Sequence, residues 1–213
     1  MLPPSIPIFP LPTVVLFPNV FLPLHIFEPR YRQMVNDALS GDRVIGMVLL
    51  KPGYEADYDG KPPVYHIGCS GLITHVERLE DGRFNLILRG LEKFTIIGEE
   101  APGTDQLYRT AMITPIDETL GTPDKQALAT ERQKLQTLLA PVFEGTLAQH
   151  RLPETMPDAD LINALAQYLD LEPLEKLALL ERPGPLARCR SMVELLEMKA
   201  IQKRMNSDVG TVH

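Results

Sequence analysis

Few residues of this 213-residue chain could do chemistry, and the first group reads as a metal site. His66, Cys69 and His75 follow one another closely enough in one segment to suggest ligands. On an extended strand, however, His66 projects from one face and the other two residues from the opposite face, unless a bulge at Gly68 or Gly71 intervenes. Three ligands also leave a structural zinc site incomplete. We therefore expect a small buried thiol and ordinary strand histidines, with no metal site.

The second group is acidic and lies in the segment from Lys51 to Pro63. Glu55, Asp57 and Asp59 loosely resemble a calcium-binding loop, but the remaining ligands and the closing glutamate are missing. A nucleophile needs a base within reach, and no catalytic motif surrounds the five histidines at positions 25, 66, 75, 150 and 213. The sequence therefore predicts an exposed, mobile loop and indicates no catalytic residue and no cofactor.

Composition narrows the class of protein. The chain is 44% apolar, 23% charged and carries a formal net charge of −7, so it can bury one large core or two modest ones. Because the acidity is spread over both halves, it argues against broad binding to nucleic acids or anionic membranes. Cys69 and Cys189 have no CxxC partner, no signal peptide opens the chain, and no apolar run is long enough to span a membrane. We expect a cytoplasmic protein.

The elements that would position these residues are strands in the first half. Pro29 opens an amphipathic helix that Gly41 ends, and Asp81-Gly82 predicts a hairpin turn. Short apolar runs, several of them cut by proline, predict the strands Ile6–Phe9, Val14–Phe17, Val20–Phe27, Arg43–Leu50, Val64–Leu79, Arg83–Arg89, Leu91–Ile97 and Leu107–Ile116. Strands at this spacing with a single helix are typical of a small closed or half-closed β-barrel.

Helical periodicity takes over near residue 118. Helices are predicted from about Pro123 to Leu139, after Asp158, and from Pro173, before the sequence RPGP at 182–185 breaks the chain ahead of a last helix. We therefore predict an α+β protein. Its domains are a β-barrel with one amphipathic helix over 1–117, an all-α helical bundle over 118–205 and a flexible tail over 206–213.

Three segments, in order, carry a family resemblance: PIFPLPTVVLFPNVFLPLHIFEPRYRQMV, RVIGMVLL and VYHIGCSGLITHVERLEDGRFNLILRGLEKFTI. They resemble the amino-terminal, substrate-binding domain of Lon proteases. The phrase FLPLHIFEPRYR looks most like the stand-alone members and the Lon-like domain of cereblon. DADLINALAQYLDLEPLEKLALLE and SMVELLEMKAIQKRM are similar to the helices that follow this domain in Lon. The resemblance runs from about Ile6 to about Met205.

The resemblance implies a pseudouridine-synthase-and-archaeosine-transglycosylase-like (PUA-like) barrel followed by a helical bundle. In Lon this region contributes to recognising unfolded or tagged protein substrates and to assembly. No phosphate-binding GxxxxGK[ST] loop is present, since Pro62 follows Gly60-Lys61 and Glu55 stands where the leading glycine should be. No Ser-Lys protease region is present either. We expect a stand-alone binding protein and no enzyme, so a peptidase label would be inherited from the family.

The sequence also offers a candidate peptide-binding site. Clustered apolar residues mark contacts, and edge strands beside them allow backbone pairing with an extended segment. The residues are Phe17, Phe21, Leu22, Phe27, Arg30 and Tyr31. The competing interpretation buries the apolar members in the core and leaves the arginine as a solvated helix charge. The expected partners are unfolded polypeptide segments, with a separate ATP-dependent protease as a second partner class.

Two other functions stay open. PUA-like barrels elsewhere bind RNA, although the net charge and the lack of a basic-aromatic stripe disfavour nucleic acid here. An enzyme of unrecognised type would need a cleft in which the pKa of a carboxylate or a histidine is strongly shifted. The last helix has a mildly basic face that could touch RNA or an acidic partner, or complement its own helix dipole: Arg188, Arg190, Lys199, Lys203 and Arg204.

Overall fold

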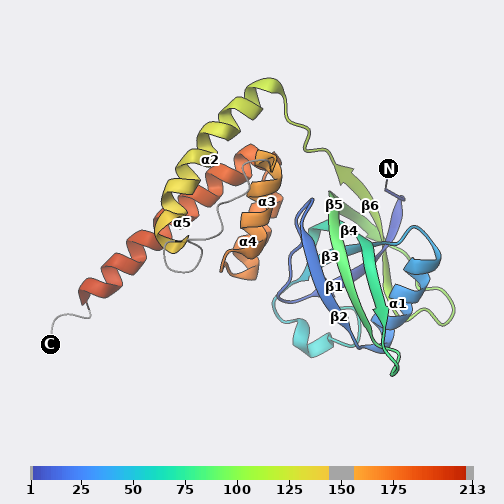
Figure 1. Ribbon diagram of the computed structural model, residues 1–213. Helices are drawn as coiled ribbons and strands as arrows, with labels where there is room; N and C mark the ends of the chain where they lie inside the picture. Colours follow the sequence, from blue (N-terminus) through green and yellow to red (C-terminus); the bar gives the residue numbers. More distant parts are fainter. Residues whose placement is uncertain (1, 144–155, 210–213) are drawn as a thin grey trace. The chain divides into compact units, whose positions relative to one another are not determined.

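The computed structural model describes residues 2–143 and 156–209 and confirms the α+β class (Figure 1). The chain forms two compact units, one made of Met1–Asp117 with Asn163–Glu181 and the other of Glu118–Ile162 with Arg182–His213. Residues 163–181 thus group with the β-strands, although they follow them by more than forty positions. The sequence-based boundaries 1–117 and 118–205 stay a prediction.

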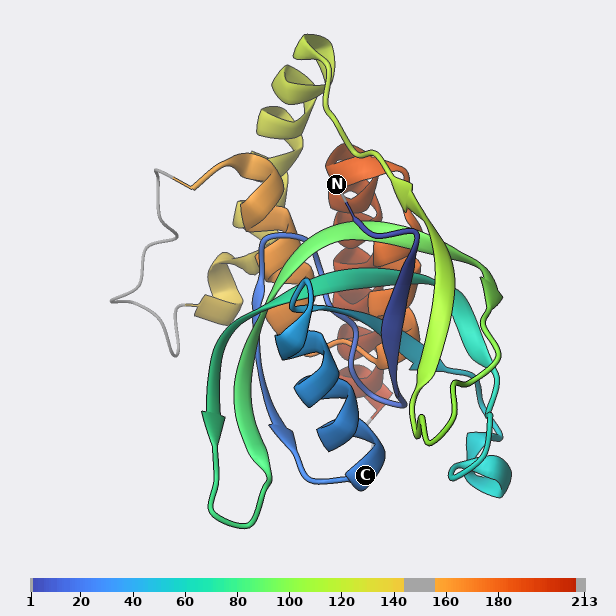
Figure 2. The ribbon, with the colours of Figure 1, turned by 90° about the vertical axis from the view of Figure 1, so that its right-hand side faces the viewer.

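The first unit contains a six-stranded mixed sheet with the order β2-β5-β4-β3-β1-β6. β5 also pairs with β6, which closes the sheet into a barrel. β1 and β3 are parallel and the other pairs are antiparallel. Figure 2 shows β4 and β5 as long curved strands that end in a projecting hairpin. The strands are β1 (Ser5–Leu11), β2 (Phe21–Ile26), β3 (Val44–Leu50), β4 (Val64–Arg78), β5 (Phe84–Glu99) and β6 (Arg109–Ile116).

β5 pairs with two different strands along its length. Its first half pairs with β2, from Phe84 opposite Ile26 to Arg89 opposite Phe21. Its second half pairs with β6, and β4 lies along both halves. The two strands predicted around residue 90 are therefore one strand. β2, the first half of β5 and the end of β4 form a three-stranded extension of the barrel, and this extension carries the candidate site.

One predicted strand is wrong. The segment 14–17 is irregular, yet Val15, Leu16 and Phe17 are buried. Pro12 and Pro18 flank the segment, and proline cannot donate to a β-ladder. The apolar run therefore supplies side chains to the core without supplying a strand.

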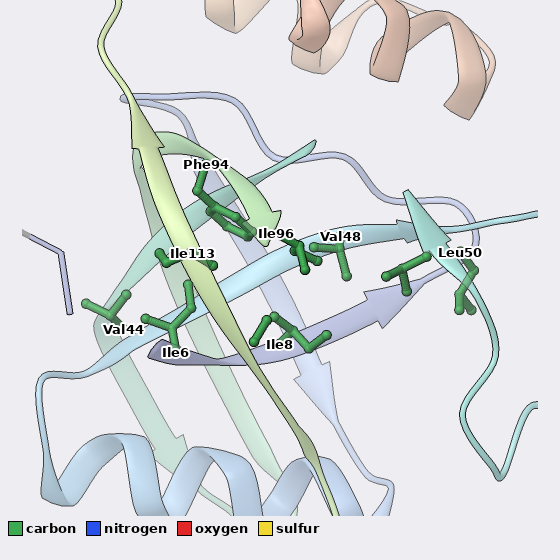
Figure 3. Packing of buried hydrophobic residues seen from close by; sticks show 10 residues of the cluster. Ile6, Ile8, Val44, Val48, Leu50, Phe94, Ile96 and Ile113 are labelled. Carbon is green, nitrogen blue, oxygen red and sulfur yellow. The ribbon is translucent and has the colours of Figure 1, made fainter. Parts of the chain in front are cut away.

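The helix α1 (Pro29–Ser40) is confirmed, with proline in its first turn. Its predicted apolar side is buried through Tyr31, Met34, Val35 and Ala38. The helix ends where the N–H groups of Gly41 and Arg43 both donate to the Ala38 carbonyl, at 3.1 and 2.9 Å. The barrel core is a separate cluster of aliphatic side chains from β1, β3, β4, β5 and β6, joined by Phe94. Figure 3 shows Ile6, Ile8, Val48 and Phe94 among them.

The loop over 51–63 is tied to distant parts of the chain by hydrogen bonds, and its mobility stays a prediction. It contains a short 3-10 helix, η1 (Tyr54–Asp57). The Lys51 N–H donates to the Pro63 carbonyl at 2.9 Å and closes the loop. Arg30 Nη1 donates to the Tyr58 carbonyl at 2.8 Å, and Arg109 Nη1 donates to the Pro62 carbonyl at 2.7 Å. Two arginines from distant elements therefore fix its path.

Four more helices follow the strands: α2 (Thr122–Phe143), α3 (Asp158–Tyr168), α4 (Pro173–Glu181) and α5 (Gly184–Val209). In the second unit α2 packs against α5, with Leu128, Leu135 and Met192 buried. α5 reaches Val209, so the backbone of 206–209 continues this helix, and the flexible tail over 206–213 stays a prediction. Residues 210–213 lie outside the described residues, as does His150. Arg188 is fully buried, so it is not part of the exposed basic face that was considered for the last helix. The side chains of Lys203 and Arg204 lie outside those described.

Candidate peptide-binding surface

The outer face of β2 carries two exposed aromatic side chains. Residues 21, 23 and 25 alternate with buried or half-buried neighbours, as on any strand with one face on the core. Phe21 is 52% exposed, and Phe27, just after the strand, is 59% exposed. The rings of His25 and Phe27 lie 6.2 Å apart between centroids and are nearly parallel, so Phe27 continues the same face.

A groove runs beside these residues, and we call it the β2 groove. Its registers join all three strands, because Pro23 lies opposite Ile87 and Ile87 lies opposite His75. Its empty volume, open solvent included, is ≈ 690 Å³. Pro23 and Ile87 give it an apolar floor, while His25, His75 and Asn85 make its polar part. The β2 groove therefore combines apolar area with a few fixed polar groups.

A hydrogen-bond chain crosses the groove and orients its polar side chains. Asn85 Nδ2 donates to Glu77 Oε2 at 2.9 Å, and the Asn85 carbonyl oxygen Oδ1 lies 2.8 Å from His25 Nδ1. Arg83 Nη1 lies 3.3 Å from His25 Nε2. Because arginine only donates, this arrangement assigns the His25 ring proton to Nδ1. Both ring nitrogens of His25 are thus engaged within the protein.

The free edge of β2 is poorly suited to strand addition. Among the described strands β2 pairs with β5 alone, so its other edge is open. Pro23 has no N–H to offer there, and the Tyr168 hydroxyl donates to the Phe21 carbonyl at 2.7 Å. The expectation that a peptide adds as a backbone-paired strand is therefore weakened. Side chains of the outer face are the groups left to make contact.

Within the first unit, the later part of α3 is joined to the segment before β2 by two further side-chain contacts. The Phe17 N–H donates to Gln167 Oε1 at 3.2 Å, and Asn163 Nδ2 donates to the Pro18 carbonyl at 3.0 Å. Backbone groups of an irregular buried segment need such partners. Side chains from α3 thus hold the chain that leads into Phe21.

The structure separates the six predicted site residues into four places. Phe21 and Phe27 share the exposed face of β2. Phe17 and Tyr31 are buried, at 0% and 5% exposure, so for them the core interpretation is correct and they cannot form an open groove. Leu22 is half-buried on the opposite face of β2, opposite buried Leu88. Arg30 lies in a separate cluster of tyrosines.

Sequence reasoning missed other members of the groove. Ile87 and Asn85 alternate with buried Phe84, Leu86 and Leu88 along β5, and this period of two was a usable signal. His75 joins them because β4 has register shifts around Ser70 and Thr74, which turn His75 to the exposed face away from buried Cys69. Tyr168 had no signal, since its contact with Phe21 depends on tertiary structure.

The candidate metal and nucleophile residues stay apart. Within residues 2–143 and 156–209, no three His, Cys, Asp or Glu side chains gather as metal ligands. Cys69 is fully buried between exposed His66 and His75. Burial raises the pKa of the Cys189 thiol to about 12, with the nearby Glu131 charge acting in the same direction. Such a thiol is not activated as a nucleophile.

Three tyrosines with perturbed titration surround Arg30 and Arg109. Burial raises the pKa of Tyr31, and it also raises the pKa of Tyr58, aided by the hydrogen bond from the Tyr58 hydroxyl to Glu28. Burial and a 2.9 Å hydrogen bond to Asp37 raise the pKa of Tyr108 to about 12.

Because of Tyr108, we expect the free energy of unfolding to decrease at alkaline pH. The pKa of Tyr108 is higher in the folded protein than the value of about 10 in unfolded chains, so the neutral phenol is favoured by folding. This contribution is fully present below pH ~10 and is lost as the pH rises from about 10 to 12. We expect Asp37→Ala to lower the pKa of Tyr108 toward 10. NMR titration of the Tyr108 ring carbons measures this pKa. The control is Asp42→Ala, which removes an exposed carboxylate and should leave the pKa of Tyr108 unchanged. An unchanged pKa of Tyr108 in Asp37→Ala would contradict the role of Asp37.

Comparison with known proteins gives the fold a class and a family. The fold resembles an amino-terminal Lon domain from Xanthomonas campestris, with a TM-score of 0.62, 24% identity and coverage of 89% of this chain and 97% of that chain. The amino-terminal domain of a Mycobacterium avium complex Lon protease gives a TM-score of 0.69 at 17% identity, with 91% and 98% covered. The fold is therefore that of amino-terminal domains of Lon proteases.

The family match is direct. The ATP-dependent protease La (LON) substrate-binding domain matches residues 5–198, and the chain belongs to this family. A Lon protease of Flavobacterium johnsoniae is 24% identical over 213 residues, which cover 98% of this chain and 26% of that protein. Lon protease 2 of Myxococcus xanthus is 27% identical, with 93% and 24% covered. The chain thus spans about a quarter of the length of these relatives. No helix in the described parts of the chain is both long enough and apolar enough to cross a membrane.

Proposed function

We propose that this protein is a non-enzymatic binding module that recognises unfolded or tagged polypeptide segments through the β2 groove. The observation that carries the proposal is the pair Phe21 and Phe27, both more than half exposed at the two ends of one strand. They are six positions apart, so an extended segment about 20 Å long would reach both rings. Membership in a substrate-binding family supports a protein partner.

Apolar burial would supply most of the binding energy. Covering ~400 Å² of apolar surface at ~25 cal/mol/Å² gives ~10 kcal/mol before association and ordering costs, which offset most of it. Affinity is then weak and broad, as a receptor of many unfolded segments requires. The blunted edge of β2 supports recognition by side chains and not by backbone pairing.

A separate ATP-dependent protease is the second partner that we propose, with this protein as its adaptor or as a holding factor. The relatives named Lon protease support this role, because the corresponding part of their chains is joined to a much longer protein. Two free, buried cysteines support a reducing, cytoplasmic location.

Fluorescence anisotropy with a labelled unfolded polypeptide and a labelled single-stranded RNA, each at low and high salt, tests the proposal. We expect the polypeptide to bind and the complex to survive high salt. Phe21→Ala and Phe27→Ala should each weaken it by about tenfold, since exposed aromatic anchors dominate such contacts. Their stability should change by no more than about 0.5 kcal/mol, because both side chains are exposed.

Ile97→Ala is the matched control, since Ile97 is an apolar β5 residue that is 66% exposed outside the β2 groove. Equal loss of binding in this variant would contradict the groove. RNA binding that collapses with salt, without polypeptide binding, would replace the proposal by the RNA-binding alternative.

A further inference from the structure

The outer face of β2 continues onto β5, where an exposed cation lies at one end of the β2 groove. Three directly opposite pairs make up this face: Phe21 with Arg89, Pro23 with Ile87, and His25 with Asn85. Side chains of directly opposite residues project from the same face of a sheet. Arg89 therefore lies beside Phe21, two positions along β5 from Ile87 in the floor of the groove.

The charge of Arg89 is not compensated by a neighbour. Its side chain is exposed, and among residues 2–143 and 156–209 it takes part in no ion pair and no side-chain hydrogen bond. Its two cross-strand neighbours, Phe21 and Leu72, are apolar. Asp170, which follows Tyr168 by two positions, forms no ion pair with it in this part of the chain. The guanidinium therefore keeps its donors for an acceptor from outside.

At the other end of the groove, toward the β4–β5 hairpin, the charges cancel. Asp81 binds Arg83 at 2.6 Å, and Arg32 reaches the same hairpin turn. Glu77, the other carboxylate on this face, accepts from Asn85 at 2.9 Å. Two acidic and two basic side chains thus balance there. The two ends of the groove differ, because an uncompensated positive charge lies at the Phe21 end.

Tyr168 enlarges the apolar area at the Phe21 end. It is 67% exposed, and its hydroxyl donates to the Phe21 carbonyl at 2.7 Å, so the two aromatic residues are neighbours. A segment that covers these rings also excludes water from the adjacent guanidinium. A charge-assisted hydrogen bond to that guanidinium is stronger where water is excluded. The end of the groove therefore suits an acidic side chain that has an apolar neighbour.

We propose that the β2 groove selects extended segments in which an acidic side chain lies next to the apolar residue that covers Phe21. The carboxylate would accept hydrogen bonds from Arg89, while apolar side chains cover Phe21 and Phe27. This inference rests on the function proposed above, and it gives the bound segment a direction, because the charges at the hairpin end cancel. The formal net charge of −7 repels acidic segments elsewhere, so the preference depends on Arg89.

Fluorescence anisotropy of the full chain with labelled nine-residue peptides, blocked at both ends so that the ends carry no charge, tests this inference. Each peptide has two phenylalanines six positions apart, with aspartate, glutamine or lysine next to either the first or the second of them. We expect one of the two aspartate peptides to bind about fivefold more tightly than its glutamine counterpart at low salt. High salt should remove this preference but not the binding itself.

Variants of Arg89 assign the preference to one side chain. Arg89→Gln should abolish it and leave the affinity for the glutamine peptides unchanged, whereas Arg89→Glu should transfer the preference to a lysine peptide. Arg78→Gln is the matched control and should keep the preference, because it removes an exposed arginine that lies opposite buried Phe84, on the other face of the same hairpin.

The failure of this inference can be told apart from the failure of the proposed function. Equal binding of aspartate and glutamine peptides would overturn the inference and leave the groove as a polypeptide site. A preference that survives in Arg89→Gln, or one shared equally by both aspartate peptides, would also overturn it. Binding of none of the peptides would overturn both. If a glutamine peptide binds only when its carboxyl end is free, the ligand is a chain end and the inference is wrong.

Discussion

Gly90→Ala should lose about 3 kcal/mol of folding free energy or fail to fold. A Cβ atom at this position would lie 2.0 Å from the Phe17 carbonyl oxygen and 3.2 Å from the Pro18 Cα atom. Both contacts are backbone atoms, so no side chain can swing aside. The two segments are also tied, since the Asn19 N–H donates to the Gly90 carbonyl at 2.9 Å and the Gly90 N–H donates to the Val20 carbonyl at 2.8 Å. The methyl group must break this contact.

Gly98→Ala, in the same strand, is the matched control. Its Cβ would meet only the terminal methyl of Met112, at 2.7 Å, and a flexible side chain can move. Urea unfolding measures both variants, and we expect Gly98→Ala to lose far less stability than Gly90→Ala. Equal stability of Gly90→Ala and the unsubstituted protein would show that residues 17–20 do not approach β5 as described.

Arg188→Ala should destabilise the second unit by about 3–5 kcal/mol, the range for breaking a buried ion pair. Arg188 is fully buried, and its Nη2 lies 2.7 Å from Glu118 Oε1. Glu118 is only 14% exposed and also accepts from the Gly184 N–H at 3.2 Å, at the start of α5. Loss of the guanidinium leaves that carboxylate without its main cation and leaves a cavity beside α5.

Hydrogen exchange of α2 and α5 amides, together with urea unfolding, measures this effect in the unit concerned. Arg188→Met fills much of the same volume and should therefore lose less than Arg188→Ala. Arg190→Ala is the exposed control, because its side chain is 55% exposed and it should change stability by no more than about 0.5 kcal/mol. A similar loss in all three variants would contradict the buried pair.

The local elements of the fold were predictable wherever one periodicity dominated. α1 followed from Pro29 and from apolar residues at helical spacing, and the hairpin followed from Asp81-Gly82, where Gly82 indeed has a φ of 81°. The irregular course of 14–17 was not predictable from its apolar run, because burial and strand formation look alike in a short segment. The anchoring of 51–63 depends on Arg30 and Arg109, which are distant in sequence.

The candidate site was predictable only in part. Phe21 and Phe27 are exposed along β2, but Phe17 and Tyr31 are aromatic as well and lie in the core. What separates the two pairs is whether the side chain is exposed, as on β2, or buried, as for Phe17 in the segment before β2 and for Tyr31 on α1. Composition carries no information on that choice. Arg30 does not lie with Phe21 and Phe27, because its guanidinium stacks on Tyr58. Tyr58 comes from a loop, and no local sequence pattern predicted that this loop lies beside α1.

The contacts from α3 and α4 to the first strands have a consequence for the growing chain. Residues 2–117 leave the ribosome well before Asn163, Gln167 and Tyr168, the side chains that meet the backbone at Phe17, Pro18 and Phe21. Lys93 is buried, and its Nζ donates to the Leu180 carbonyl at 2.7 Å. Because Leu180 is synthesised still later, this hydrogen bond forms after the others. These contacts of the strands with α3 and α4 are therefore delayed until some sixty further residues have been synthesised, and partners made so far apart slow folding. During that interval the nascent β2 region is itself an unfinished apolar surface, of the kind that chaperones bind.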